Sequence, residues 1–445
     1  MVTMPQPPVG QTRYERIMLD LSRDPDGTAA LFRDASQAAR SLVPATDIHQ
    51  RVIRDVAAGV AAPALVGAVV WMLREAERRG LARLRFLSRD GQIFYELTRR
   101  LTSLLDMEID VEYVYSSRLT WSLAASDPTR LDEEAWLFNS FMKSNAHDLC
   151  ARLGLPLDYY TKPLAAAGVS LDPDARADRP RQAEAMRRFL RTPQITDVVA
   201  DRINQARRML VDYAAEHLLL DRRTGLVDAG WTGRMINSLL RACRTDVQQR
   251  PHALLWGYEP RGAVDPADLD RVAAYMYNTA TGDGLQWRVP DAPFLIETFC
   301  MGDHGIVTGY NRTPAGQIEP VLRTPGNPAA EAWGLPTYRA TLYAFAEQLA
   351  KLPSEDSRPL IHQLMAALWC HPSRSEAATW GAYPYDSDPA GTAIRPLARP
   401  LNEQTRIRED RAWISGALAL SSPTARERYL ARASTGELRG VPAPD

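Results

Sequence analysis

The residues best suited to chemistry lie in one short segment near the middle of the chain. A short apolar run over residues 225–227 ends in Asp228, and a loop containing glycine, threonine and arginine follows over residues 229–234. Apolar residues then return at helical spacing from Met235 onward, so the segment predicts a strand, a tight loop and a helix start. Backbone N–H groups at a helix start have no partner within the helix and bind phosphate well.

The side chains of this loop fit the same chemistry. Gly230 and Gly233 let the backbone approach a ligand closely, Thr232 offers a hydroxyl, and Arg234 offers a fixed positive charge. We place Asp228 at the carboxyl end of the strand, where it could hold sugar hydroxyls or a metal ion.

Two more polar loops follow predicted strands. The apolar run at 84–87 leads into Ser88, Arg89, Asp90 and Gly91, and a helical pattern follows over 93–101. The run at 111–115 ends in Ser116, Ser117 and Arg118. Carboxyl ends of parallel strands meet at one edge of a sheet, so the three loops predict one ligand crevice above a parallel sheet. Arginines beside hydroxyls and glycines favour a polyphosphate or sugar phosphate.

Composition indicates a globular cytoplasmic protein. The 445 residues are 45 % apolar and 24 % charged, and the net charge of −1 gives no general nucleic-acid surface. The four cysteines are far apart without a CxxC pair, which favours buried thiols over disulfides or a zinc site. The N-terminus lacks the pattern of a signal peptide.

One apolar segment has nearly the length of a membrane span. Residues 56–73 carry no charge, but they are rich in alanine and glycine and include Pro63. We interpret Pro63 as the first turn of a buried helix that reaches Arg79, with Gly80 just beyond its end. The sequence therefore predicts a core helix and no membrane association.

The patterns predict an α/β protein with five regions. These are an N-terminal helical extension over 1–55, a first core half over 56–125, a helical insertion or cap over 126–220, a second core half over 221–325 and a mainly helical region over 326–445. Residues 1–12 are expected to be disordered. Further expectations are helices at 14–40, 194–220, 337–351, 360–369 and 402–439, a strand at 252–258, a connecting stretch at 265–277, and a hairpin of 306–310 with 318–322.

The segment around Asp228 resembles the signature of the phosphoribosyltransferase fold. In that fold a strand ends in acids that hold the ribose hydroxyls, and a Thr-Gly loop binds the 5-phosphate of phosphoribosyl pyrophosphate (PRPP). The resemblance implies a phosphoribosyltransferase-like parallel sheet core. The chain departs from the pattern because Ala229 replaces the second acid and the loop from Asp228 to Thr232 is one residue short.

A closer resemblance covers residues 60 to 325, apart from the helical insertion. The motifs at 86–91, 115–118, 227–233 and 295–310 occur in this order in a bacterial family whose members look like O-ribosylating enzymes. These members lie beside, or are fused to, HAD-type phosphatases in polysaccharide clusters. The resemblance implies transfer of 5-phosphoribosyl from PRPP to a sugar hydroxyl with release of pyrophosphate. The acceptor would be a polysaccharide or an aminoglycoside intermediate such as a neamine-like pseudodisaccharide. A separate phosphatase would act afterwards, and a homodimer is possible.

The resemblance also implies roles for the site residues. Arg89 and Arg118 would bind pyrophosphate together with Mg²⁺, and the loop from Gly230 to Arg234 would bind the 5-phosphate. Asp228 would hold the ribose. Asp90 or Glu297 would be the base, and Asp90 is also the candidate metal ligand.

Acidic residues are the candidates for binding a polycationic acceptor. Glu297 and Asp303 are the first candidates, and the further ones are Asp132, Glu133, Glu134, Asp172 and Asp174. Trp231 is expected to pack beside the phosphate loop. His304, next to Asp303, could act with it as a catalytic base, although a histidine in a turn is the favoured interpretation.

Two alternatives from other classes stay open. A HAD-like phosphatase or hydrolase would need a second acid two residues after a nucleophilic aspartate, and the segment after Asp228 lacks it. A non-catalytic sugar-phosphate-binding protein would keep the phosphate loops without a base. Neither a Gly-x-Gly-x-x-Gly nor a Walker-type loop is present.

Overall fold

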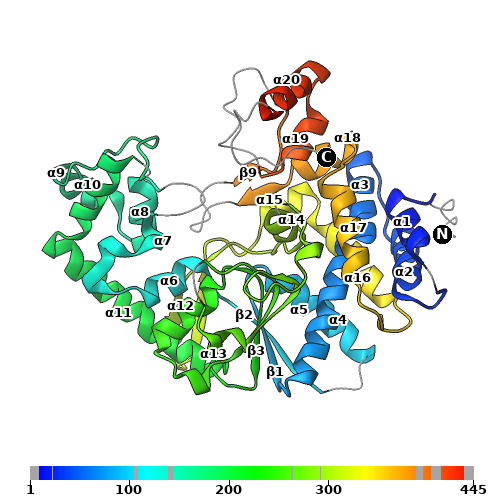
Figure 1. The fold of residues 1–445 in the computed structure, drawn as a ribbon. Coiled ribbons are helices and arrows are strands. Elements are labelled where there is room, and N and C mark those ends of the chain that lie inside the picture. Colours follow the sequence, from blue (N-terminus) through cyan, green and yellow to red (C-terminus); the bar gives the residue numbers. More distant parts are fainter. Residues whose placement is uncertain are drawn as a thin grey trace.

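A five-stranded parallel β-sheet lies at the centre of the molecule in a computed structural model of the chain (Figure 1). The structure describes residues 10–22, 24–104, 108–138, 144–177, 179–261, 264–290, 292–386, 394–401 and 412–434. The strands are β1 (Arg83–Leu87), β2 (Asp110–Val114), β3 (Thr224–Trp231), β4 (His252–Tyr258) and β5 (Val272–Asn278). They lie in the order β2-β1-β3-β4-β5, and every pairing in this sheet is parallel. The predicted α/β class is confirmed.

The sheet reverses its strand order at β1. The chain runs from β1 to β2 on one side and then crosses to β3 on the other side, so Phe86 pairs with both Tyr113 and Val227. In open α/β sheets, ligands bind where the order reverses, at the carboxyl ends of the strands. That point lies between the loops after β1 and β3.

Helices cover both faces of the sheet, because the strands alternate their side chains between two cores. Leu254 and Trp256 of β4 pack in the core with α4 (Ala62–Arg78) and α5 (Gly91–Leu101). Ala253 and Leu255 face the opposite core with α6 (Arg118–Ala125), α11 (Pro193–Glu216) and α12 (Arg234–Cys243). Buried on both faces, the strands read as continuous apolar runs in the sequence.

The long apolar segment is part of a core helix, and Pro63 lies in the first turn of α4, as predicted, but α4 continues a longer helical stretch. One helical stretch runs over residues 48–78 as α3 (Ile48–Val56), the π-helical η1 (Ala57–Ala61) and α4. Pro63 therefore lies inside this stretch, next to the π-turn, where the ordinary hydrogen-bond pattern is already interrupted. This stretch has the length and composition of a membrane span, but its apolar window is 94 % buried inside the protein.

The region at 126–220 is helical, as predicted, and has its own small core. Its elements are η3 (Pro128–Glu133), α7 (Ala135–Phe138), α8 (Ala146–Leu153), α9 (Leu157–Ala166), α10 (Pro180–Leu190) and α11. Leu149, Met186, Phe189 and Ile203 belong to this core. The helices α8, α9 and α10 project away from the sheet (Figure 1). The predicted helix at 194–220 ends at Glu216.

The second half of the core differs from the prediction at one strand. The stretch at 265–277, expected to be a connection, contains α13 (Pro266–Leu269) and most of the edge strand β5. The predicted hairpin is confirmed as β6 (Val307–Arg312) and β7 (Ile318–Leu322). Other elements here are η4 (Val247–Gln249), η5 (Leu285–Trp287) and α14 (Ala292–Phe299).

The C-terminal region is mainly helical but adds a small hairpin. Its helices are α15 (Pro328–Trp333), α16 (Leu335–Glu347), α17 (Arg358–Trp369), α18 (Arg374–Gly381), α19 (Ile414–Leu420) and α20 (Pro423–Ser434). The predicted helices at 337–351 and 360–369 correspond to α16 and α17. The hairpin of β8 (Pro384–Asp386) and β9 (Ile394–Pro396) was not predicted. Residues 402–411 and 435–439 of the last predicted helix lie outside the described residues.

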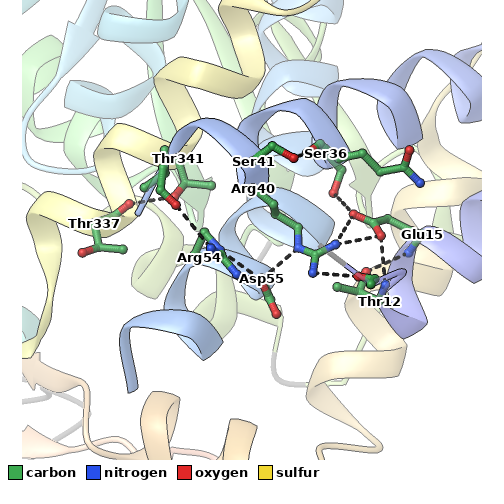
Figure 2. A network of polar contacts seen from close by, with 12 residues as sticks. Thr12, Glu15, Ser36, Arg40, Ser41, Arg54, Asp55, Thr337 and Thr341 are labelled. Atoms are coloured by element: carbon green, nitrogen blue, oxygen red, sulfur yellow. Dashed lines mark hydrogen bonds and ion pairs between the residues drawn. The ribbon is translucent and has the colours of Figure 1, made fainter. Parts of the chain in front are cut away.

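Two N-terminal helices, α1 (Arg13–Leu21) and α2 (Thr28–Leu42), replace the single predicted helix at 14–40. A buried polar network joins them to α3 (Figure 2). The guanidinium of Arg40 donates to both carboxylate oxygens of Glu15, at 2.8 and 2.9 Å, and to Asp55 at 2.9 Å. The hydroxyl of Ser36 donates to Glu15 at 3.0 Å. Of the predicted disordered residues 1–12, the first nine lie outside the described residues.

Candidate active site at the carboxyl ends of the strands

A cavity of about 700 Å³ opens above the carboxyl ends of β1, β2, β3 and β4. It is the predicted crevice, and it brings together most of the predicted site residues. Those that line it are Ser88, Arg89, Asp90, Ser116, Ser117, Arg118, Asp228, Gly230, Trp231, Thr232, Arg234 and Glu297. None of the residues that line it comes from the helical insertion at 126–220, so the described part of that insertion does not cap the cavity.

Three carboxylates approach one another on one side of the cavity. Burial raises the pKa of Asp90 well above its usual value, and the negative charges of Glu297 and Asp228 raise it further. Burial also raises the pKa of Asp228 to about 6, although N–H groups of Ala229 and Gly230 oppose the shift. The Ala229 N–H donates to Asp228 at 2.9 Å. Asp90 accepts no hydrogen bond from any described residue, so its charge is poorly compensated within the protein.

Arg118 lies among these carboxylates without bonding to any of them. It forms no hydrogen bond or ion pair with a described residue, and its side chain is exposed in the cavity. Burial lowers its pKa, but the charges of Glu297 and Asp90 outweigh this effect, and the net shift is upward. The guanidinium is thus available to an anionic ligand.

A second group of positive charges surrounds the start of α12. Desolvation lowers the pKa of Arg234, and the nearby charges of Arg261 and Arg118 lower it further. Arg234 and Arg261 form no hydrogen bond or ion pair with described residues. A bound anion would relieve the repulsion among the three arginines.

The backbone at this helix start is shaped by two glycines. Strand β3 continues to Trp231, three residues beyond the predicted end at Asp228, so the loop is only Thr232 and Gly233. Gly233 has a φ of 68° and no side chain caps the helix. Gly230 is required for a different reason than predicted: a Cβ there would lie 2.4 Å from the carbonyl oxygen of Gly257 on β4. Its role is close strand packing.

The predicted serine ligands are already engaged with the protein. The Ser88 hydroxyl donates to the Ser116 carbonyl at 2.6 Å and accepts from the Ser116 N–H at 2.8 Å. The Ser117 hydroxyl caps α6 through the Thr120 N–H at 3.0 Å and donates to the Val307 carbonyl at 2.7 Å. Their hydroxyls therefore fix the loops that present Arg89, Asp90 and Arg118.

Helix α14 and strand β8 complete the cavity. Glu297, a candidate base and acceptor ligand from sequence, belongs to α14. The Tyr385 hydroxyl donates to Glu297 at 2.6 Å. Arg89, predicted to bind pyrophosphate, pairs with Asp386 at 3.0 Å.

Several cavity residues were missed by the sequence analysis. They are Glu259, Pro260, Arg261, Thr279, Arg288, Phe294, Ile306 and Tyr385. Glu259 pairs with Arg288 at 2.6 Å. Glu259 and Arg261 directly follow the predicted strand at 252–258, and the rule used for the other three strands, applied there, finds both. Tyr385 carried no comparable signal.

Other predicted residues lie at the edge of the cavity or outside it. Gly91 and Gly233 belong to the helix starts beside it. Asp303 pairs with Arg339 at 2.8 Å and does not line the cavity. His304 is buried against Tyr113, with its Nε2 2.7 Å from the tyrosine hydroxyl, and it has a structural role.

The remaining acids proposed for a polycationic acceptor do not gather at the cavity either. Asp132, Glu133 and Glu134 pair with Arg191, Arg130 and Arg241, and neither Asp172 nor Asp174 is among the lining residues. Glu297 is thus the one member of that set that lines the cavity.

Trp231 lines the cavity as well as packing beside the loop. Its φ is 67°, and its indole N–H is buried without a hydrogen-bond partner among the described residues.

The described residues contain no group of three or more histidine, cysteine, aspartate or glutamate side chains arranged for a metal ion. No disulfide joins the four cysteines; Cys150 and Cys300 are buried, as predicted, whereas Cys243 and Cys370 are only partly buried. Mg²⁺ usually takes one or two carboxylates together with substrate phosphates and water. Asp90 and Asp228, each with a raised pKa, fit that partial role.

Comparisons with known proteins do not identify the chain: no model of a protein family matches it, and no curated protein resembles it significantly.

Proposed function

We propose that the cavity binds PRPP and transfers its 5-phosphoribosyl group to a sugar hydroxyl, releasing pyrophosphate. The observation that carries the proposal is a set of arginines without ion-pair partners among described residues, next to a group of carboxylates, in one cavity at the switch point of the sheet. Unpaired arginines at the start of α12 and at Arg118 lie beside the carboxylates Asp90, Asp228 and Glu297. PRPP has the complementary pattern: two phosphate-bearing ends joined by a ribose with free hydroxyls. The core would then be of the phosphoribosyltransferase type.

The two phosphate ends have separate proposed sites. The 5-phosphate binds the uncapped start of α12 through backbone N–H groups, Thr232 and Arg234. Pyrophosphate binds Arg118 and Arg89, and Arg89 exchanges its Asp386 contact for the ligand. Asp228 accepts hydrogen bonds from the ribose hydroxyls, so ribose binding requires its ionised form.

Departure of pyrophosphate leaves positive charge on the anomeric carbon of the ribose. The carboxylates of Asp90, Asp228 and Glu297 stabilise that charge, and the arginines neutralise the leaving group. The acceptor hydroxyl attacks the carbon and loses its proton to a carboxylate. Mg²⁺, when bound, would be held by Asp90 and Asp228 and would neutralise pyrophosphate. Glu297, oriented by Tyr385, holds the acceptor hydroxyl.

Asp90 has two proposed roles, base or Mg²⁺ ligand, and the Asp90→Asn variant separates them. If Asp90 is the base, the variant should lose about a hundred- to ten-thousandfold in turnover, while its affinity for PRPP in the presence of Mg²⁺ stays the same. If Asp90 is the metal ligand, the variant should lose the Mg²⁺-dependent part of its affinity for PRPP. Glu297→Gln is the matched comparison, because it removes the other candidate base.

Two other functions are weaker explanations. A HAD-type phosphatase needs a second acid two residues after its nucleophile, and Gly230 stands at that position after Asp228. A non-catalytic sugar-phosphate-binding protein needs the arginines but gains nothing from an acid such as Asp90, whose pKa is raised by desolvation and by neighbouring carboxylates. Retained PRPP binding without turnover on any acceptor would favour the binding protein.

The test of the proposed function is acceptor-dependent pyrophosphate release. Protein, PRPP and Mg²⁺ are incubated with aminoglycosides and with neutral and acidic oligosaccharides, and the masses of the products are measured by mass spectrometry. The expected result is pyrophosphate release with one acceptor class and a product heavier by one phosphoribosyl unit. Absence of PRPP binding would contradict the proposal. Since the transfer leaves a 5-phosphate on the product, a separate phosphatase is the expected next enzyme.

A further inference from the structure

A second cavity adjoins the first along helix α12. It has a volume of about 480 Å³ and lies between α12, α13 and the neighbouring ends of β4 and β5. It shares Thr232, Pro260 and Arg261 with the proposed PRPP site. Its volume is within the range of small-ligand sites, and a molecule bound there can reach the first cavity over Arg261. We call this second cavity the α12 groove.

The α12 groove is lined by an excess of positive charge. Five arginines line it, Arg241, Arg244, Arg250, Arg261 and Arg271, against two acids, Asp265 and Asp268. Arg250 pairs with Asp268, and Arg241 pairs with Glu134 at 2.8 Å. The side chains of Arg244 and Arg261 form no hydrogen bond or ion pair with any described residue. These two guanidiniums are thus available to a ligand.

The arginines affect one another over the length of the helix. Burial lowers the pKa of Arg207, which lies beyond the groove, and the charges of Arg244 and Arg241 lower it further. At the start of α12, the charge of Arg261 contributes to the lowering of the pKa of Arg234. The positive potential therefore extends from the PRPP site to the far end of α12.

The side chains along α12 form a continuous surface. Asn237 and Arg241 are four residues apart, which places them on one side of the helix, and Arg244, the left-handed residue that ends α12, lines the groove with them. Asn237 and Arg244 are exposed. The groove thus offers an amide followed by guanidiniums along one line that starts at the PRPP site.

We propose that the α12 groove binds the anionic part of the acceptor, a saccharide that carries phosphate or carboxylate groups. The inference rests on the proposed function, because the acceptor hydroxyl has to reach the ribose in the adjoining cavity. It replaces the polycationic acceptor considered from sequence, since most of the acids invoked for that acceptor lie outside the site, while five arginines line the groove that adjoins it. The arginines bind the anionic groups of the acceptor, and Glu297 binds the acceptor hydroxyl that receives the phosphoribosyl group.

The test is direct binding of four probes by calorimetry at low salt. Trigalacturonate and glucose 1-phosphate are the anionic probes, maltotriose is neutral, and neamine is cationic. Arg244→Asn is the test variant, since Arg244 has a φ of 50° and asparagine tolerates that conformation better than most residues. Arg222→Asn is the matched control, because Arg222 is an exposed turn residue before β3 and lines neither the α12 groove nor the first cavity.

The expected result is binding of the anionic probes in preference to maltotriose and neamine. Arg244→Asn should raise the Kd of the anionic probes about fivefold or more, which corresponds to the loss of one charged contact. Arg222→Asn should leave the Kd unchanged, and neither variant should change PRPP affinity. Equal or tighter binding of maltotriose or neamine, or an Arg244→Asn variant with unchanged affinity for the anionic probes, would overturn the inference.

A parallel titration with PRPP keeps the two proposals apart. If the wild-type protein binds PRPP while Arg244→Asn changes nothing, the inference fails and the proposed function stands. If trigalacturonate binds in an Arg244-dependent manner while PRPP does not bind, the proposed function fails and the α12 groove keeps its anion-binding assignment.

Discussion

Two clusters of charged side chains in this protein are built in opposite ways. In the N-terminal cluster, Glu15 and Arg40 are almost fully buried, and the carboxylate receives hydrogen bonds from Arg40, Ser36 and the Thr12 N–H (Figure 2). In the crevice, Asp90 and Arg118 form no hydrogen bonds with described residues and influence each other only through their charges.

The difference indicates what each cluster is for. A buried ion pair whose donors and acceptors are all matched keeps three helices together, and its charges are not available to a ligand. Charges that repel their neighbours and lack partners cost stability, and under the proposed function a bound ligand compensates them. The comparison predicts that mutations in the two clusters change stability in opposite directions.

The largest expected effect is in the N-terminal cluster. Arg40→Leu leaves the Glu15 carboxylate buried without its main partner, which should lower the free energy of unfolding by about 3–5 kcal/mol. Urea denaturation followed by circular dichroism measures the change. Arg33→Leu on the same helix breaks an exposed pair with Asp34 and should cost less than about 1 kcal/mol. Equal effects of the two variants would show that burial does not govern this cluster.

Arg234→Ala should separate ligand binding from stability. Loss of a charged contact to phosphate should weaken PRPP binding about ten- to hundredfold. Stability should stay constant or rise by about 0.3–1 kcal/mol, because an arginine in the first turn of a helix opposes the helix dipole and is repelled by Arg261 and Arg118. Calorimetry and urea denaturation on the same preparations measure both. A clear loss of stability would place Arg234 among the structural charges.

Asp228→Asn should stabilise the protein in a pH-dependent way. The pKa of Asp228 is raised to about 6 in the folded protein, above its usual value, so ionisation is unfavourable to the fold. This cost of ionising Asp228 is absent below about pH 4 and complete above its pKa in the folded protein. At such pH values the variant should be more stable than the wild type by about 1–3 kcal/mol. Asparagine keeps the acceptor oxygen for the Ala229 N–H. Urea midpoints at pH 4, 6 and 8 check this. A variant that is destabilised at pH 8 would contradict it.

Tyr385→Phe should have the smallest effect. It removes the hydrogen bond that orients Glu297. Acceptor KM should rise, and kcat/KM should fall about three- to tenfold, with the affinity for PRPP unchanged. Burial raises the pKa of Tyr385 well above its usual value, so the hydroxyl remains protonated and the effect should not vary with pH between 6 and 9. Tyr159→Phe is the control, because Tyr159 is exposed on the helical insertion.

The sequence was informative where function depends on local order along the chain. A strand, its polar loop and the next helix are neighbours in sequence, so the crevice could be predicted from residues 84–91, 111–118 and 225–234. The loss of alternation in strands buried on both faces also helped to locate β1 and β4. The edge strand β5 was missed because its residues 272–278 follow a charged helix and carry no turn signal on the amino side.

Contacts between distant segments could not be predicted in this way. Tyr385 and Glu297 are separated by 88 residues, and Arg89 and Asp386 by 297. Nothing in the local pattern of residues 383–386 distinguishes a site residue from a turn. Charge was similarly misleading, because acids such as Glu133 and Asp303 read as candidate ligands until their arginine partners are known.

The central claim is that the unpaired charges of the crevice serve PRPP, and calorimetry of the wild-type protein tests it most directly. PRPP, ribose 5-phosphate and pyrophosphate are titrated separately in the presence of Mg²⁺. The account predicts one PRPP per chain, bound more tightly than either fragment because PRPP occupies the α12 start and the Arg118 end together. No binding of PRPP, or binding no tighter than that of pyrophosphate alone, would contradict the claim.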